Sequence, residues 1–160
     1  MRCTIHPATA QDVARVVIGH DSWSRDAGEG GLNGLDALLE ACAMSRQVWT
    51  ASNAAGDPLA FIGAAPWADD AGRGRLWFII LAAYDGNDAD LKSVMRLTVG
   101  EMLQEFGQLE NHVSSEKAWA LELMREAGFT VAPAHPAADG VCRHRVWIDA
   151  DAQGSAFSAA

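Results

Sequence analysis

Two side chains suited to acid–base chemistry stand two residues apart in this chain. Glu110 and His112 lie in residues 108–113, which we predict to form a short strand. A carboxylate or imidazole near a reacting amine can act as a general base, and the phenol of Tyr84 can act as an acid. If the chain is an enzyme, these three residues are its catalytic candidates. The alternative is that they are hydrogen-bonded or packed residues and that no residue is catalytic.

An acidic loop lies between the longest apolar strand candidate and a long helix candidate. Residues 76–82 are continuously apolar, and residues 91–106 carry apolar side chains at helical spacing. The connection contains Asp85, Asp88 and Asp90 but no Lys or Arg. A strand that leads into a helix N-terminus often binds an anion through free amides. Two like charges about 4 Å apart repel by ~4 kcal/mol at an effective dielectric near 20, so these carboxylates would oppose phosphate.

Capping of the helix explains the acidic loop better than metal binding does. The loop lacks the spacing and the distal glutamate of a calcium-binding EF-hand, and we expect no metal site. We expect no bound cofactor either. If the junction does bind an anionic cofactor, the residues that it would offer are Leu81, Ala82, Gly86, Asn87 and Asp88.

Composition limits the class of protein. The chain has 160 residues, of which 49% are hydrophobic and 21% charged, which predicts one globular domain over residues 1–149 with a flexible tail at 150–160. The formal net charge of −9 argues against a nucleic-acid partner. Three separated cysteines predict reduced thiols, and the absence of a long apolar run predicts no membrane span. We therefore expect the chain to fold in a cytosolic compartment.

The predicted elements follow the order β-α-α-β-β-β-α-β-α-β-β. Thr9 is the predicted N-cap of the first helix, with Asp12 in the capping-box position. Residues 47–52 and 58–65 form a predicted hairpin, and Gly128 is predicted to end the last helix. This order indicates an α/β (α+β) fold with a central mixed, mostly antiparallel sheet of about six to seven strands and helices on both faces.

The tryptophans divide by predicted location. Trp77, Trp119 and Trp147 fall on predicted helices or strands and are expected in the core. Trp23 and Trp67 fall in predicted loops, where an aromatic side chain can contact a partner protein or fold back over the sheet. Self-association is a further possibility for such contacts.

Three stretches together resemble the GNAT acetyltransferase fold: residues 4–12, the hairpin around residues 53–58, and residues 109–129. The resemblance implies acetyl-CoA bound by glycine-rich amides between the fourth strand and the third helix. Here that place holds residues 84–90, with the single glycine Gly86 among carboxylates. Many members also carry a tyrosine acid in the fourth helix, where this chain has Met124. These departures predict a fold retained without its chemistry.

A narrower resemblance is to a small GNAT-like virion protein of short-tailed bacteriophages. Residues 59–66 and 109–113 are similar to motifs of that family, as are residues 123–129, although Trp119 stands four residues before the usual tryptophan. The resemblance implies an assembly role, other virion or core proteins as partners, and residence in the cytoplasm of a bacterial host with packaging in a virion. The alternative is an active N-acetyltransferase with an atypical acetyl-CoA loop.

Overall fold

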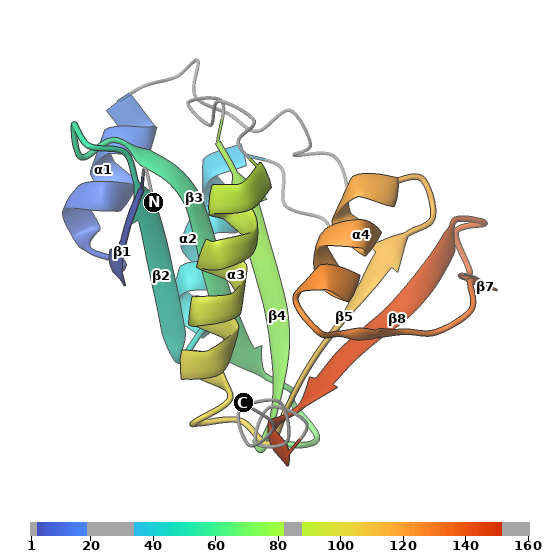
Figure 1. Cartoon of the computed structure of the whole chain (residues 1–160). Coiled ribbons are helices and arrows are strands. Elements are labelled where there is room, and N and C mark those ends of the chain that lie inside the picture. Colours follow the sequence, from blue (N-terminus) through green and yellow to red (C-terminus); the bar gives the residue numbers. More distant parts are fainter. Residues whose placement is uncertain (1–2, 19–33, 82–87, 152–160) are drawn as a thin grey trace. The chain divides into compact units, whose positions relative to one another are not determined.

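The computed structural model describes residues 3–18, 34–81 and 88–151 (Figure 1), and the statements below concern these residues. They form two compact units. The first comprises Met1–Ala65 and Trp77–Thr98, and the second comprises Pro66–Leu76 and Val99–Ala160. The prediction of one domain over residues 1–149 with a flexible tail stays a prediction, and residues 152–160 lie outside the described part.

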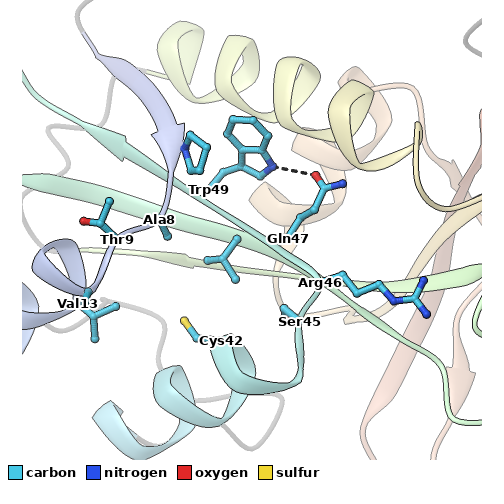
Figure 2. A pocket seen from close by; sticks show the side chains of 11 residues that line it. Ala8, Thr9, Val13, Cys42, Ser45, Arg46, Gln47 and Trp49 are labelled. Atoms are coloured by element: carbon cyan, nitrogen blue, oxygen red, sulfur yellow. Dashed lines mark hydrogen bonds between the residues drawn. The ribbon is translucent and has the colours of Figure 1, made fainter.

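The first unit packs helices on both faces of a twisted sheet (Figure 1). One face carries a core cluster of Val16, Leu38, Phe61, Trp77 and Leu81, which joins the first two helices to the sheet. The third helix lies on the opposite face, as Figure 2 also shows. The elements are β1 (Thr4–Pro7), α1 (Ala10–Ile18), α2 (Gly34–Met44), β2 (Gln47–Ser52), β3 (Pro58–Pro66), and parts of β4 (Arg73–Ile80) and α3 (Asp88–Met102).

The second unit is a meander around the last long strand. Its elements after α3 are β5 (Gln108–Ser114), α4 (Ala118–Glu126), β6 (Thr130–Val131), β7 (His135–Pro136) and β8 (Cys142–Asp149). β8 pairs antiparallel with β5, β6 and β7. Gly128, at φ 97°, follows α4 in the left-handed conformation, which confirms it as the end of that helix.

The strands are ordered β1-β2-β3-β4-β5-β8-β6, and β7 also pairs with β8. β4 and β5 pair in parallel over three residues on each strand, from Arg73 opposite Gln108 to Arg75 opposite Glu110. The pairs of β1 with β2, β2 with β3, and β8 with its neighbours are antiparallel. The predicted α/β fold with a mixed, mostly antiparallel sheet is therefore confirmed.

The predicted capping box at α1 is confirmed and extends into the sheet. The Thr9 amide donates to Asp12 Oδ2 at 2.8 Å, and the Asp12 amide donates to Thr9 Oγ1 at 3.2 Å. His6 Nε2 and Thr50 Oγ1 lie 3.0 and 3.1 Å from the same carboxylate oxygen. Burial alone would raise the pKa of Asp12, but these hydrogen bonds lower it. One carboxylate thus holds β1, α1 and β2 together.

Several predicted boundaries were wrong. β4 begins at Arg73 rather than at residue 76, because Arg73 and Arg75 pair with β5 while Gly74 faces the apolar side. α3 covers Asp88–Met102 rather than 91–106, so part of the predicted acidic loop is its first turn, where carboxylates suit the helix dipole. A short strand, β7, forms at His135–Pro136, so the described part of the sheet has one strand more than the seven of the predicted order.

Candidate functional site

Glu110 is held by two arginines. Its residue is only 4% exposed, and its Oε2 accepts a hydrogen bond from Arg145 Nη2 at 2.7 Å. Arg73 Nη1 lies 4.0 Å from the same oxygen. Hydrogen bonding to Glu110 raises the pKa of Arg145 above its ordinary value. The Glu110 carboxylate is therefore placed as a counter-ion to both arginines, and its predicted role as a catalytic candidate stays a prediction.

His112 shares a strand face with Glu110 and is exposed. Its backbone amide donates to Asn111 Oδ1 at 2.7 Å. The parallel pairing with β4 ends at Glu110, so this side-chain oxygen satisfies an amide located beyond that pairing. The His112 imidazole remains the one predicted base whose side chain the structure places in an exposed position.

The backbone amide of Leu81, directly after β4, is already hydrogen-bonded. The Leu81 amide donates to the Leu59 carbonyl at 2.8 Å, and Leu81 is buried. An amide that already donates cannot also bind a ligand carbonyl without losing that bond. The predicted residues Ala82, Tyr84, Gly86 and Asn87 lie outside the described residues. Asp88 opens α3, and its side chain is likewise outside the described part.

Three described groups bear on the predicted acetyl-CoA alternative: two backbone amides and the side chain of Met124. The amides of Leu81 and His112 are occupied. Met124 lies on α4, the helix in which the family resemblance implies a tyrosine acid. Its thioether side chain is fully buried and cannot donate a proton. None of these three groups offers a free hydrogen-bond donor, and the other predicted acetyl-CoA residues, or for Asp88 the side chain, lie outside the described part.

The predictions for the tryptophans were partly wrong. Trp77 is buried as expected, and its Nε1 donates to Ser45 Oγ at 2.7 Å. Trp119 is 40% exposed, because it stands in the first turn of α4 next to the buried Ala120 and Leu121. Trp147 is half-buried rather than in the core, because it shares the polar face of β8 with Arg145, whose guanidinium lies 4.4 Å from its ring centroid.

Trp67, a predicted partner contact, is half-buried in the turn between β3 and β4, where its amide donates to the Arg73 carbonyl. Arg73 and Arg75 lie 5.0 and 5.9 Å from its ring centroid. Sequence reasoning missed these arginines. The signal was their spacing of two, repeated at Arg143 and Arg145, which places each pair on one strand face. Trp23, the other predicted contact, lies outside the described residues.

The structure also has a pocket that the sequence did not indicate. It has a volume of about 530 Å³ and lies in the first unit, where β1 passes into α1 beside the end of α2 (Figure 2). Figure 2 shows Cys42 and Ser45 on one side of β2, and Gln47 hydrogen-bonded to Trp49 on the other. The lining residues are Pro7, Ala8, Thr9, Ala10, Val13, Cys42, Ser45, Arg46, Gln47, Val48 and Trp49.

The polar groups of this pocket are largely occupied. Ser45 Oγ donates to the Ala41 carbonyl at 2.6 Å and accepts from Trp77. Thr9 Oγ1 caps α1. Burial raises the pKa of the Cys42 thiol, which keeps it protonated and weakly nucleophilic near neutral pH. The pocket is large enough for a small ligand but shows no assembled reaction centre.

Among the described residues, no three His, Cys, Asp or Glu side chains gather closely enough to hold a metal ion. The predictions of no metal and no cofactor stay predictions, since residues 82–87 belong to the candidate junction. None of the described helices is both long and apolar enough to cross a membrane.

The arrangement of elements matches solved acetyltransferases along nearly the whole chain. An aminoglycoside acetyltransferase in complex with coenzyme A is 15% identical, with a TM-score of 0.72 over 96% of this chain and 98% of that one. The ribosomal-protein-S18-alanine N-acetyltransferase from Escherichia coli is 14% identical, with a TM-score of 0.67 over 92% and 93%. A GNAT-family acetyltransferase from Streptococcus pneumoniae is 14% identical, with a TM-score of 0.69 over 92% and 99%.

No protein-family model and no curated protein sequence matches this chain. The structural matches are distant in sequence, so they show the fold alone. The chain has the fold of the GNAT acetyltransferases, as its motifs predicted.

Proposed function

We propose that this chain is a GNAT-fold protein that acts through contacts with other proteins, in the assembly of a bacteriophage virion, and does not catalyse acetyl transfer. The observation that supports a non-catalytic role is the placement of Glu110, whose carboxylate accepts a hydrogen bond from Arg145 at 2.7 Å and serves as its counter-ion. The occupied amides of Leu81 and His112 and the buried Met124 support the same conclusion. The phage role is supported by the motif resemblance at residues 59–66, 109–113 and 123–129.

An active acetyltransferase is the second candidate function. It is favoured by the structural match to enzymes of this fold, one of them solved with coenzyme A. The exposed His112 would be its base, with acetyl-CoA as cofactor. The two functions differ most directly in whether the folded chain binds acetyl-CoA.

Thermal unfolding with and without acetyl-CoA separates the two functions. A ligand at about a hundred times its dissociation constant adds ~2.7 kcal/mol to stability, which raises the melting temperature by roughly 5–10 °C for a chain of this size. We expect no rise with millimolar acetyl-CoA beyond that produced by ATP, which controls for general phosphate binding. A specific rise with acetyl-CoA, together with acetyl transfer to an amine, would refute the proposal.

The assembly role is tested on particles from cells infected by a phage that encodes the chain. We expect the chain in purified particles or assembly intermediates by mass spectrometry, and less of it when Trp67 is replaced by alanine. Trp119→Ala is the matched control, because it removes an exposed tryptophan from α4. Absence of the wild-type chain from every particle form would refute the assembly role.

A further inference from the structure

The basic residues of the second unit are concentrated on two strands. Its sequence contains six Lys and Arg residues, and four of them lie on β4 and β8. The six are Arg73, Arg75, Lys117, Arg125, Arg143 and Arg145. This concentration stands out in a chain of formal net charge −9.

Strand alternation and Glu110 bring arginines of both strands to one face of the sheet. Gly74 lies between Arg73 and Arg75, and a Cβ added there would come within 2.8 Å of Leu109 Cδ2, on the apolar face. The two arginines therefore point the other way. On β8, Arg145 likewise alternates with the fully buried Val146. Glu110 contacts Arg73 and Arg145, so these side chains meet over β5.

Aromatic rings hold these guanidinium groups in place. Arg73 and Arg75 stack against Trp67, and Arg145 stacks against Trp147 at 4.4 Å. A stacked guanidinium keeps its N–H edge available for a planar acceptor and loses less side-chain entropy on binding. We call the set Trp67, Arg73, Arg75, Glu110, Arg145 and Trp147 the arginine–tryptophan patch.

The patch is not saturated by its own carboxylates. Arg145 is satisfied by Glu110, and Arg73 has Glu110 at 4.0 Å and the exposed Asp69 at 3.6 Å. Arg75 is exposed, and no described carboxylate lies within 4.0 Å of it. In the described part, the buried Nε of Arg73 and Nε1 of Trp67 also lack an acceptor. Such donors are costly unless an acceptor is supplied.

We infer that the arginine–tryptophan patch binds a carboxylate-bearing segment of a partner protein. Arg75 would pair with a carboxylate, and Trp67 would cover an adjacent apolar side chain. Nucleic acid fits less well, because Arg75 is one guanidinium without a carboxylate partner among the described residues and so suits a single carboxylate, whereas Glu110, Asp69 and the net charge of −9 oppose a chain with a phosphate at every nucleotide. The inference deepens the proposed contact role and rests on it.

Fluorescence anisotropy tests the inference directly. The probe is a fluorescein-labelled glycine–serine peptide that carries one glutamate beside a leucine, at low ionic strength. It is compared with the same peptide carrying glutamine in place of the glutamate, and with a single-stranded oligonucleotide of equal length. We expect the glutamate peptide alone to bind. Failure of that peptide to bind, or tighter binding of the oligonucleotide, would overturn the inference.

Two variants with the same change in net charge localise the binding. Arg75→Gln should weaken binding of the glutamate peptide about tenfold or more, because the substitution removes a charge-assisted hydrogen bond. Arg125→Gln, on α4, should leave the affinity unchanged; equal losses in both variants would show a general charge effect and overturn the inference. Arg75→Lys keeps the positive charge but loses the planar guanidinium that stacks on Trp67, so this variant should bind the peptide with intermediate affinity. Unchanged melting temperatures would show that the variants fold.

The acetyl-CoA thermal shift on the same preparations distinguishes the two proposals. A rise in melting temperature with acetyl-CoA would refute the non-catalytic function. If peptide binding is at the same time lost only in Arg75→Gln, the inference about the arginine–tryptophan patch still holds. No shift and no peptide binding would refute the patch and leave the non-catalytic function standing.

Discussion

Replacing Arg145 by methionine would leave the Glu110 carboxylate in place with its closest partner removed. The Glu110 side chain is 6% exposed, and the Arg145 side chain is 40% exposed. Breaking a fully buried ion pair costs about 3–5 kcal/mol, whereas an exposed pair contributes about 0.2–1 kcal/mol. This half-exposed pair falls between the two, and Arg73 at 4.0 Å still offsets part of the loss. We expect Arg145→Met to lower the free energy of unfolding by about 2 kcal/mol.

Urea unfolding at neutral pH measures this loss, and a double-mutant cycle assigns it to the pair. With an m-value of about 2 kcal/mol/M, the midpoint should fall by about 1 M. Glu110→Gln should cost about 1 kcal/mol, because an amide oxygen can still accept from Arg145. The double variant should be more stable than the sum of the single effects predicts, with a coupling of about 1 kcal/mol.

The matched control is Arg125→Met, which breaks the exposed pair of Arg125 with Glu122, 3.8 Å apart, and should change stability by no more than about 0.5 kcal/mol. If Arg145→Met costs no more than this control, or if the two substitutions are additive, Glu110 is not held as a counter-ion. The argument that its carboxylate serves as the counter-ion of Arg145 would then fail.

Two further predictions concern the first unit. Gly63→Ala would place a Cβ 2.5 Å from the Trp77 ring, and this overpacking should cost about 2 kcal/mol in the free energy of unfolding, measured in urea; a neutral effect would contradict the packing of Trp77 over β3. Because the folded pKa of Asp12 is lowered, its contribution to stability is present above the unfolded pKa and is lost as the pH falls from about 4 through the folded value. Asp12→Asn should therefore show a smaller loss of stability on acidification than the wild type, and parallel pH profiles would contradict that role.

The sequence predicted those features whose signals are local. The capping box needs only Thr9 and Asp12, three residues apart, and the end of α4 needs only the left-handed Gly128. The hairpin of β2 and β3 is likewise fixed by the short turn between them. These elements were placed correctly because neighbouring residues determine them.

The features that define the candidate site depend on register instead. The pairing of Glu110 with Arg145 joins residues 35 apart, and it follows from β5 and β8 lying side by side. The predicted strand began only at residue 76, because the arginines ahead of it are stabilised by Trp67 and Glu110. The sequence alone does not place those two side chains beside the arginines. Neither contact has a local sequence signal.

The position of β8 has a consequence for synthesis. This strand is the partner of β5, β6 and β7, and it pairs with β5 up to Asp149. As long as β8 is still inside the ribosomal tunnel, the edge of β5 that pairs with β8 has no hydrogen-bonding partner. Folding of the second unit is expected to finish only after translation has passed β8, which makes this interval the point at which a chaperone would protect the chain.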